Sequence, residues 1–406
     1  MEKKDINSAR RALANRAQLL VNHFKRPFYD GMIRNVISNV YNFDTDPMLF
    51  AEVDPDPINH KAAGWRMYKH TDVRVVKATT HKAIVIPKIE NPDPICRVAV
   101  LNFASAKNPG GMFLEGSAAQ EETLCHNSLL YPVLEKCEEH YSYNKKNLRH
   151  GIYPHTMIYS EQVPFYDITL IPTEVNDEIE FRTKDLLQST MSKSFIEIGS
   201  VCTVESVPID ISHLVEDISS DADVITCAAP NFNAYELYIH RRLNGEDKDV
   251  IRKAYFDIFD AMRTRIHYIF RVALAHGVSD LILGAWGCGV FGWDPAHVAS
   301  LFRYEIEKYW MCQFRSILFA APTTAGYGYR RSVTNQNTFK VIFSIVTTDE
   351  IDSDGGPLQY WHVLYGKDRE ITKYFQQYMD DLIQSDLSKC METTIHNEAH
   401  SDTVEQ

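Results

Sequence analysis

From Arg97 onward, short apolar runs alternate with long stretches in which apolar residues recur every three to four positions. The short runs contain few polar residues, which is typical of strands that are buried on both faces of a sheet. These runs are Arg97–Phe103, Asp223–Ala229, Asp280–Ala285 and Ser316–Ala320. The clearest helical stretch extends from Val250 to His276, and Gly277 is its expected C-cap. This alternation predicts an α/β fold with a mostly parallel sheet covered by helices on both faces.

The segments around this core are predicted from periodicity alone. Helices are expected at Ser8–His23, Met32–Val40 and Arg369–Ile383, and strands at Val73–Pro87 (one or two) and Phe339–Val346. The polar residues from His396 to the end are expected to lack stable structure. Between Pro172 and Asp221 the pattern weakens, which indicates an insertion with little regular structure.

We therefore expect three parts. Residues 1–72 form an N-terminal helical extension, residues 73–347 form the α/β domain with an insertion at about 173–221, and residues 348–406 form a C-terminal helix and tail.

Composition and charge narrow the class of protein. Of 406 residues, 45% are hydrophobic and 24% charged, as expected for a globular protein with a real core. The formal net charge of −12 argues against bulk electrostatic binding to nucleic acid or to an anionic membrane. No apolar run reaches membrane-spanning length, and the first residues lack the apolar core of a signal peptide. We expect an intracellular protein, cytoplasmic or nuclear.

Several common catalytic and metal-binding motifs are absent. The eight cysteines form no C-x-x-C pair and no His pair has zinc spacing, so reduced thiols are expected. The chain has no G-x-x-x-x-G-K-[ST], which argues against a P-loop nucleotidase, and no G-x-S-x-G, which argues against the usual esterase.

The first candidate loop runs from Asn108 to Glu122, directly after the strand that ends at Phe103. In open α/β sheets, ligands bind at the carboxyl ends of the strands, where this loop must lie. Gly110 and Gly111 allow the backbone to approach a ligand closely. Ser117 and Gln120 have capping-box spacing, which predicts Ser117 as the N-cap of the next helix. Glu121 and Glu122 then fall in its first turn, where acidic residues are also common for purely structural reasons.

The second candidate loop is GAWGCGVFGWDP, which begins at Gly284 after a strand and ends at a helix start. Asp294 is the expected N-cap and Pro295 the first helical residue. Gly287, Gly289 and Gly292 have G-x-G-x-x-G spacing, so successive backbone N–H groups are suited to a diphosphate. Either Phe291 or Trp286 is suited to stack on an adenine, although a tight glycine turn with packed aromatic side chains explains the string equally well.

The same spacing raises the alternative of a Rossmann dinucleotide site. Such a site expects an acidic residue at the end of the next strand, but Ser316–Ala320 is followed by alanine and proline. We therefore discount a hydride-transfer enzyme. Two further polar residues are ambiguous: His126 is either a proton carrier or a partly exposed residue of a helix face, and Asn231 is either a ligand contact or a turn residue.

Three strings carry a resemblance to a known family. VLNFASAKNPGGMFLEGSAAQEETLC, VITCAAPN and LILGAWGCGVFG resemble the microbial-type poly(ADP-ribose) glycohydrolase family, from the N-terminal helix to about Pro322. The resemblance implies a macrodomain-like mixed sheet flanked by helices, with the N-terminal helical extension before it and an extra C-terminal segment after it. It implies hydrolysis of the ribose–ribose bond of poly(ADP-ribose), or release of ADP-ribose from a modified acceptor, and no metal or cofactor.

The resemblance also implies roles for individual residues. Glu122 would be the catalytic acid/base and Glu121 would hold ribose hydroxyls. Gly110 and Gly111 would line the distal ribose, with Asn108 and Gln120 as further ligand contacts. The diphosphate and nucleoside would lie on Gly287, Cys288, Gly289, Val290, Phe291 and Gly292. Glu122 would enter the reaction protonated because burial, Glu121 and the ligand's diphosphate all disfavour its anion.

Two departures from the family pattern bear on the substrate. Met112 stands where the family usually has a third glycine, so its side chain is expected to narrow the site or change which leaving group fits. The stretch Thr173–Asp221 is longer than expected and would reshape access. The alternatives are a non-catalytic reader of ADP-ribose, and an enzyme whose acceptor is a nucleic-acid base or a small molecule; neither membrane nor strong nucleic-acid binding is expected.

Overall fold

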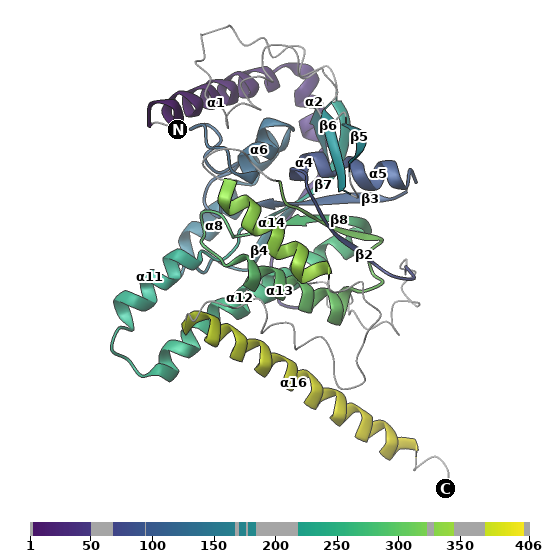
Figure 1. Ribbon diagram of the computed structural model, residues 1–406. Coiled ribbons are helices and arrows are strands. Elements are labelled where there is room, and N and C mark those ends of the chain that lie inside the picture. The colour runs from purple at the N-terminus through teal and green to yellow at the C-terminus, as the bar shows by residue number, and fades with distance from the viewer. Residues whose placement is uncertain are drawn as a thin grey trace. The chain divides into compact units, whose positions relative to one another are not determined.

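The computed structural model describes residues 3–49, 68–93, 95–166, 170–175, 178–183, 218–322, 329–344 and 370–401 (Figure 1). The chain divides into two compact units, residues 1–234 with 263–347 and residues 235–262 with 348–406. Among the described residues, no helix is long and apolar enough to cross a membrane.

The first unit is organised around one mixed sheet. Seven strands of the described chain form it in the order β1-β4-β7-β3-β8-β9-β2. Their bounds are β1 Ser38–Asn42, β2 Asp72–Val76, β3 Arg97–Phe103, β4 Thr156–Tyr166, β7 Ile218–Cys227, β8 Val278–Gly284 and β9 Ser316–Ala320. From β7 to β2 neighbouring strands are parallel, while β1, β4 and β7 pair antiparallel. The mostly parallel sheet predicted from the apolar runs is therefore confirmed.

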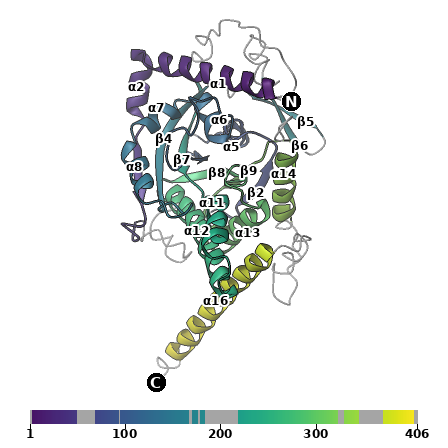
Figure 2. The same cartoon turned by 90° about the vertical axis from the view of Figure 1, so that its left-hand side faces the viewer.

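Helices pack on both faces of this sheet, as Figure 2 shows. Their bounds are α1 Lys3–Phe24, α2 Pro27–Asn35, α4 Thr80–Ala83, α5 Val85–Glu90, α6 Gln120–His126, α7 Leu130–Glu135, α8 Glu138–Lys146, the second part of α12 Lys248–Ala275, α13 Pro295–Glu305, the π-helical turn η3 Ile306–Trp310 and α14 Tyr329–Ser344. Most of α11 Phe232–Arg242 belongs to the second unit. Side chains of a strand alternate between the two faces. Val98 and Val100 of β3 thus share a core with Leu20 of α1 and Leu124 of α6, and aromatic rings of α12 and α13 pack together through Phe270 and Phe302.

The strongest sequence patterns coincide with the structure. β3 and β9 have the predicted bounds, and β8, α1 and α12 differ from prediction by a few residues at their ends. Gly277, with φ +70°, adopts the left-handed conformation expected of a C-cap after α12.

The N-terminal predictions need two corrections. The second helix ends at Asn35, and residues 38–42 instead form β1 because they pair with β4, with Val40 opposite Ile158. The segment 73–87 is a strand only as far as Val76; α4 and α5 follow because this arrangement fully buries Ala83 of α4 and Ile84, which lies between the two helices. Tertiary burial overrides the β-propensity of Val and Ile here.

The later predictions also need correction. Part of the expected irregular insertion is a hairpin, β5 Leu170–Val175 paired with β6 Glu178–Thr183, and β7 begins at Ile218; residues 184–217 lie outside the described chain. The strand predicted at 339–346 is wrong over its described residues, which belong to α14. Phe339 and Phe343 lie one helical turn apart and both pack on Phe319 of β9.

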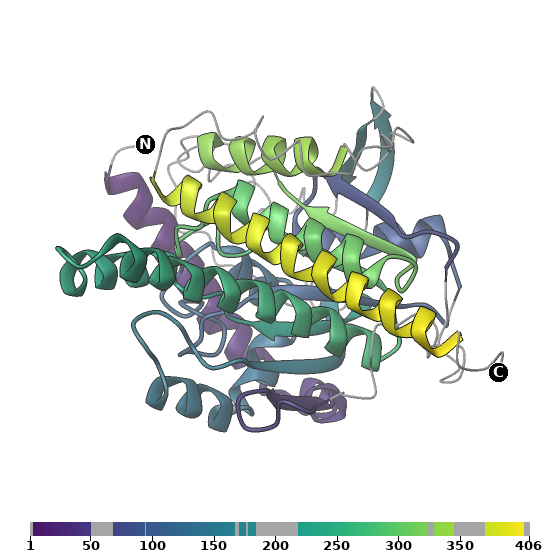
Figure 3. The ribbon, with the colours of Figure 1, turned by 90° about the horizontal axis from the view of Figure 1, so that it is seen from below.

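The second unit contains α16 Glu370–Ser401 and the first part of α12 (Figure 3). Within it, Tyr374 stacks on Tyr255 and Phe375 packs edge-on against Phe259, so the amphipathic helix predicted at 369–383 is confirmed. The helix continues to Ser401, whereas the residues from 396 were expected to lack structure; residues 402–406 lie outside the described chain.

Candidate active site

The two glycine loops leave the sheet side by side. β3 and β8 are adjacent parallel strands, with Val100 opposite Ile282, and the loops follow their carboxyl ends at Phe103 and Gly284. A ligand at this edge of the sheet can therefore reach both loops.

Glu121 is buried at the end of β3. Its side chain is only 3% exposed; Oε2 accepts a hydrogen bond from the Ser105 backbone N–H at 2.6 Å, and Oε1 accepts one from Asn102 Nδ2 at 3.3 Å. Burial raises the pKa of Glu121 to about 8, and the nearby Glu122 adds to the rise, while the bonds from Ser105 and Asn102 oppose it. Glu121 therefore retains a proton at neutral pH.

Glu122 lies beside it and is 5% exposed. Its Oε1 accepts a hydrogen bond from the Met112 backbone N–H at 2.9 Å. Its Oε2 is buried and has no hydrogen-bond partner among the described residues. A buried oxygen without a partner costs free energy, so this atom is suited to bond to a ligand.

Gly110 and Gly111 allow the first loop to close on these carboxyls. Both have positive φ, +66° and +64°. A Cβ on Gly111 would lie 2.6 Å from Glu122 Oε1 and 2.9 Å from Glu121 Oε2, so both carboxyls approach the same point of the backbone. A Cβ on Gly110 would lie 2.6 Å from the Tyr131 ring. Glycine is required at both positions by conformation and by space.

Gln120 connects the glutamate helix to the rest of the site. Its Oε1 accepts a bond from the Phe103 N–H at 2.8 Å, and its Nε2 donates to Leu101 O at 2.8 Å and to Thr80 Oγ1 at 3.1 Å. The predicted capping box is therefore wrong: the N-cap residue of α6 is Ala119 rather than Ser117, and it makes no side-chain cap bond. The glutamine side chain binds β3 and α4 instead of the helix start.

The second loop is held by α11 and by its own tryptophans. Asn233 Nδ2 donates to Val290 O at 3.0 Å, the Asn233 N–H donates to Phe291 O at 3.0 Å, and Gly292 packs directly on the Asn233 side chain. Gly287 and Gly292 have φ of +78° and +79°. Asp294 caps α13 by accepting the Ala296 N–H at 2.9 Å, as predicted.

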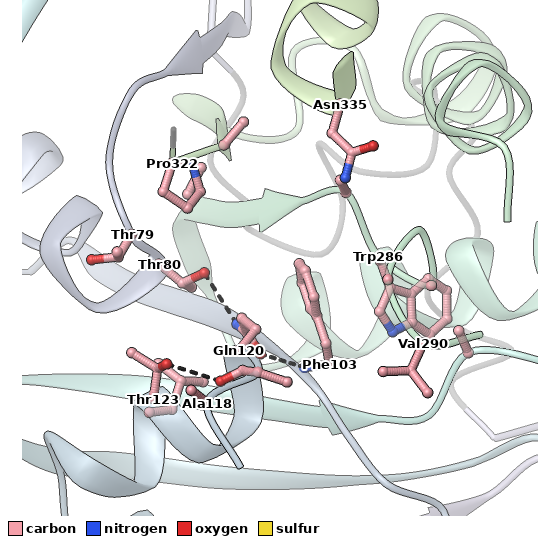
Figure 4. Close-up of a pocket in the computed structure, with 18 of the residues that line it drawn as sticks. Thr79, Thr80, Phe103, Ala118, Gln120, Thr123, Trp286, Val290, Pro322 and Asn335 are labelled. Atoms are coloured by element: carbon pink, nitrogen blue, oxygen red, sulfur yellow. Dashed lines mark hydrogen bonds between the residues drawn. The ribbon is translucent and has the colours of Figure 1, made fainter. Parts of the chain in front are cut away.

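A cavity of about 440 Å³ opens beside these loops, at the ends of β3, β8 and β9 (Figure 4). Most of its wall is apolar, and it includes Phe103, Trp286 and Phe291. It is lined by Thr79, Thr80, His81, Phe103, Ala118, Ala119, Gln120, Thr123, Leu124, Ala229, Ala285, Trp286, Gly287, Gly289, Val290, Phe291, Ala320, Ala321, Pro322 and Asn335. The size and lining suit a small-molecule ligand with a flat apolar part.

The residues predicted for the site fall into two neighbouring groups. Gln120, Gly287, Gly289, Val290 and Phe291 line the cavity. Glu121, Glu122, Gly110 and Gly111 lie together, as the contacts above show, and none of them lines the cavity. Cys288 is buried with its Sγ 3.7 Å from Trp286 O, Gly292 packs on Asn233, and Asn108 is exposed, so none of these three lines the cavity.

The structure shows the surroundings of His126 and Asn231, the two residues whose roles were left open by the sequence. His126 is 1% exposed and packs on Phe113, so the expectation of a partly exposed histidine is wrong. Burial lowers the pKa of His126 to about 3, which makes it a poor proton carrier. Asn231 Oδ1 accepts the Ala234 N–H at 3.0 Å, the arrangement of a turn residue at the start of α11.

Other residues of the site were not identified from the sequence. Asn102 and Ser105 bind Glu121, and Thr80 binds Gln120. Asn102 is a polar residue that follows an apolar run within β3, and this interruption of the pattern is visible in the sequence. Arg265 is fully buried and donates to Ala228 O and Tyr153 O, both at 2.6 Å. Within the described residues, no group of three or more His, Cys, Asp or Glu side chains is arranged to hold a metal ion.

Solved structures share this architecture. A poly(ADP-ribose) glycohydrolase from Deinococcus radiodurans in complex with ADP-ribose is 24% identical; the alignment covers 79% of this chain and 99% of that chain, with a TM-score of 0.52. One from Thermomonospora curvata bound to the inhibitor ADP-HPD is also 24% identical, with coverage of 81% and 99% and a TM-score of 0.50. The fold is a macrodomain-like α/β fold, as predicted.

The family comparison is more specific than the fold. Residues 41–167 match the family model described as the microbial-type PARG catalytic domain. This segment contains the first glycine loop and both glutamates, so the resemblance drawn from the sequence is confirmed there. A comparison with curated proteins gives no match.

Proposed function

We propose that this protein is an ADP-ribose glycohydrolase that cleaves the ribose–ribose bond of poly(ADP-ribose) or releases ADP-ribose from a modified acceptor. The observation that carries the proposal is the state of Glu122: buried, fixed through Oε1 to the Met112 N–H, and with Oε2 unpartnered among the described residues. A glycosidase needs such a carboxyl group against the scissile bond. The match of residues 41–167 to the microbial-type PARG catalytic domain supports the same activity.

The ligand would lie across the carboxyl edge of the sheet. The distal ribose would contact Gly110 and Gly111, and the diphosphate would lie on backbone N–H groups of residues 287–292. The nucleoside would occupy the cavity beside Phe291. There Thr79 Oγ1 and His81 Nδ1 have no hydrogen-bond partner among the described residues, and burial lowers the pKa of His81 to about 3, so its ring stays neutral.

The two glutamates would share the acid–base chemistry. Burial keeps a proton on Glu121, and in the proposed mechanism this proton passes to the neighbouring Glu122 carboxyl. Glu121, held by Ser105 and Asn102, would bind ribose hydroxyls. Glu122 would deliver the proton to the leaving oxygen and then, as a carboxylate, activate the attacking water. The raised pKa falls on Glu121, whereas the acid of the reaction is expected to be Glu122.

A non-catalytic reader is not favoured. The burial of two adjacent carboxyls, at 3% and 5% exposure, lowers the stability of the fold. Their presence therefore indicates a function that needs them. Binding alone requires the cavity and the second glycine loop, but not this pair. The proposal includes an intracellular site of action, cytoplasmic or nuclear, which agrees with the six free cysteines among the described residues.

The direct test is product analysis. The protein is incubated separately with poly(ADP-ribose), mono-ADP-ribosylated protein, ADP-ribosylated DNA and a small-molecule ADP-ribose conjugate, and the released products are identified. Free ADP-ribose from any of them supports a hydrolase and defines the acceptor. Binding of ADP-ribose without release from any substrate would restore the reader, and no binding at all would exclude both.

We expect activity to fall as the pH rises above about 8. Because the pKa of Glu121 is raised from 4.5 to about 8, Glu121 keeps its proton below that pH and loses it above. A single required proton gives a loss of about tenfold per pH unit on the alkaline side. The measurement is kcat from pH 5 to 10, with Glu121→Gln as comparison. An alkaline limb that is unchanged in Glu121→Gln contradicts this assignment.

Met112 is expected to restrict the leaving group. Its N–H bonds Glu122, its side chain is 46% exposed, and its φ is not positive, so the backbone does not require glycine at this position. Met112→Gly should raise kcat/KM for poly(ADP-ribose) relative to mono-ADP-ribosylated protein by up to about tenfold, because it removes a bulky side chain from the residue whose N–H binds the Glu122 carboxyl. The ratio of the two kcat/KM values is measured; an unchanged ratio rules out this role.

A further inference from the structure

Helix α1 contacts the first glycine loop beyond its glycine pair. Arg10 Nε donates a hydrogen bond to Glu115 O at 2.9 Å. The next residue, Gly116, has φ +76°, and an added Cβ would overlap the Arg10 carbonyl oxygen and lie 2.8 Å from the Ala14 backbone nitrogen. The loop therefore packs backbone to backbone against α1, and only glycine permits this approach.

The same helix also holds α6, which carries both glutamates (Figures 1 and 2). The Arg16 side chain is 7% exposed, and its Nη2 donates to His126 O at the end of α6 at 3.2 Å. Leu13, Ala17 and Leu20 of α1 are buried in the core, so the helix is a fixed support.

The contact of α1 with the loop and its contact with α6 lie on the two sides of the hydrogen bond between Met112 and Glu122. The bond from the Met112 N–H to Glu122 Oε1 joins the loop to α6. On the loop side, the Ser117 N–H donates to Met112 O at 3.1 Å, so Met112 is tied to the residue directly after Gly116. On the helix side, Glu122 lies one turn before His126. Because α1 contacts both sides, it sets the distance between Met112 and the Glu122 carboxyl.

We propose that α1 is a brace that positions Glu122, with Arg10, Arg16 and Gly116 as positioning residues for the hydrolysis. This inference rests on the proposed function. The brace acts on the first loop and on α6, which carry the carboxyl and also form one wall of the cavity, whereas the second glycine loop is held by other contacts. Its loss therefore lowers turnover much more than it weakens ADP-ribose binding.

The test is Gly116→Ala against Gly277→Ala. Gly277 has a similar φ of +70°, but no atom lies within 4 Å of an added Cβ, so it controls for backbone strain alone. Gly116→Ala should lower kcat by about a hundredfold, since displacement of a catalytic group by about 1 Å has that effect. KM and the ADP-ribose Kd should change less than about threefold. Gly277→Ala should retain wild-type kcat per folded molecule.

A second readout is independent of catalysis. The Met112 amide is protected by its bond to Glu122, so hydrogen exchange at Met112 should accelerate in Gly116→Ala and not in Gly277→Ala. If Gly116→Ala does not fold, Arg10→Met is measured in its place, with Arg10→Lys as the conservative variant. Wild-type kcat and exchange in these variants, or equal losses in Gly116→Ala and Gly277→Ala, would overturn the brace. An inactive wild-type protein with the expected exchange pattern would contradict the hydrolase and leave the brace intact.

Discussion

Glu122→Gln should lose turnover by about 10²–10⁴-fold, the usual contribution of a general acid–base group, while ADP-ribose still binds. The amide is nearly isosteric and its carbonyl oxygen can still accept the Met112 N–H, so the loop should keep its position. It can neither deliver a proton to the leaving oxygen nor activate water. The measurements are kcat on poly(ADP-ribose) and on mono-ADP-ribosylated protein, and the Kd of ADP-ribose by calorimetry.

Glu161→Gln is the matched control for this substitution. Glu161 is a partly buried glutamate of β4 that pairs with Arg97, away from both glycine loops. It should retain turnover. Wild-type-like turnover in Glu122→Gln would remove that residue from the mechanism, and parallel loss of ADP-ribose binding would indicate a structural role instead.

Gly111→Ala should lower kcat by about a hundredfold for a different reason. The new methyl group would press on Glu122 Oε1 and Glu121 Oε2 at once, at 2.6 and 2.9 Å, in a backbone conformation that alanine rarely adopts. The loop must move away from the carboxyls, and in the proposed site the distal ribose would lose its surface. Steady-state kcat and thermal unfolding are measured together.

The control for strain alone is Gly245→Ala, because Gly245 has φ +90° and open space around the added Cβ. It should lose some stability and no turnover. Equal kcat in Gly111→Ala and wild type would show that the first loop does not contact the reacting sugar.

Much of the sheet was predictable because its strands are buried on both faces and are therefore nearly continuous apolar runs. β3 and β9 follow this rule. The same reasoning failed for residues 339–344, where Val, Ile and Phe suggested a strand, but contacts with Phe319 from a distant part of the chain decide for a helix. The short helices after Val76 were missed for the same reason: their burial depends on neighbours that the local sequence does not contain.

The site was predictable to a similar degree. The glycine pairs and the glutamates are local motifs, so the sequence identified them as candidates, and their roles stay predictions. The hydrogen-bond partners that hold the two carboxyls could not be read from the motif. Glu121 is bound by the Ser105 N–H and by the buried amide of Asn102, and Glu122 is bound by the Met112 N–H. The spacing of Ser117 and Gln120 predicts a capping box, yet the Gln120 side chain forms its hydrogen bonds with the Phe103 N–H and with Thr80 Oγ1 instead.

The parallel pairing of β3 with β8 has a consequence for how such a site changes over time. The roots of the two loops are separated by one interstrand spacing, about 4.8 Å, which backbone hydrogen bonds impose regardless of side chains. The sheet therefore fixes the distance between the two loops, and so the distance between the two parts of a ligand that they can bind. Substitutions at the loop tips, for example at Met112, can then alter which ligand is accepted without changing the distance between the two loops.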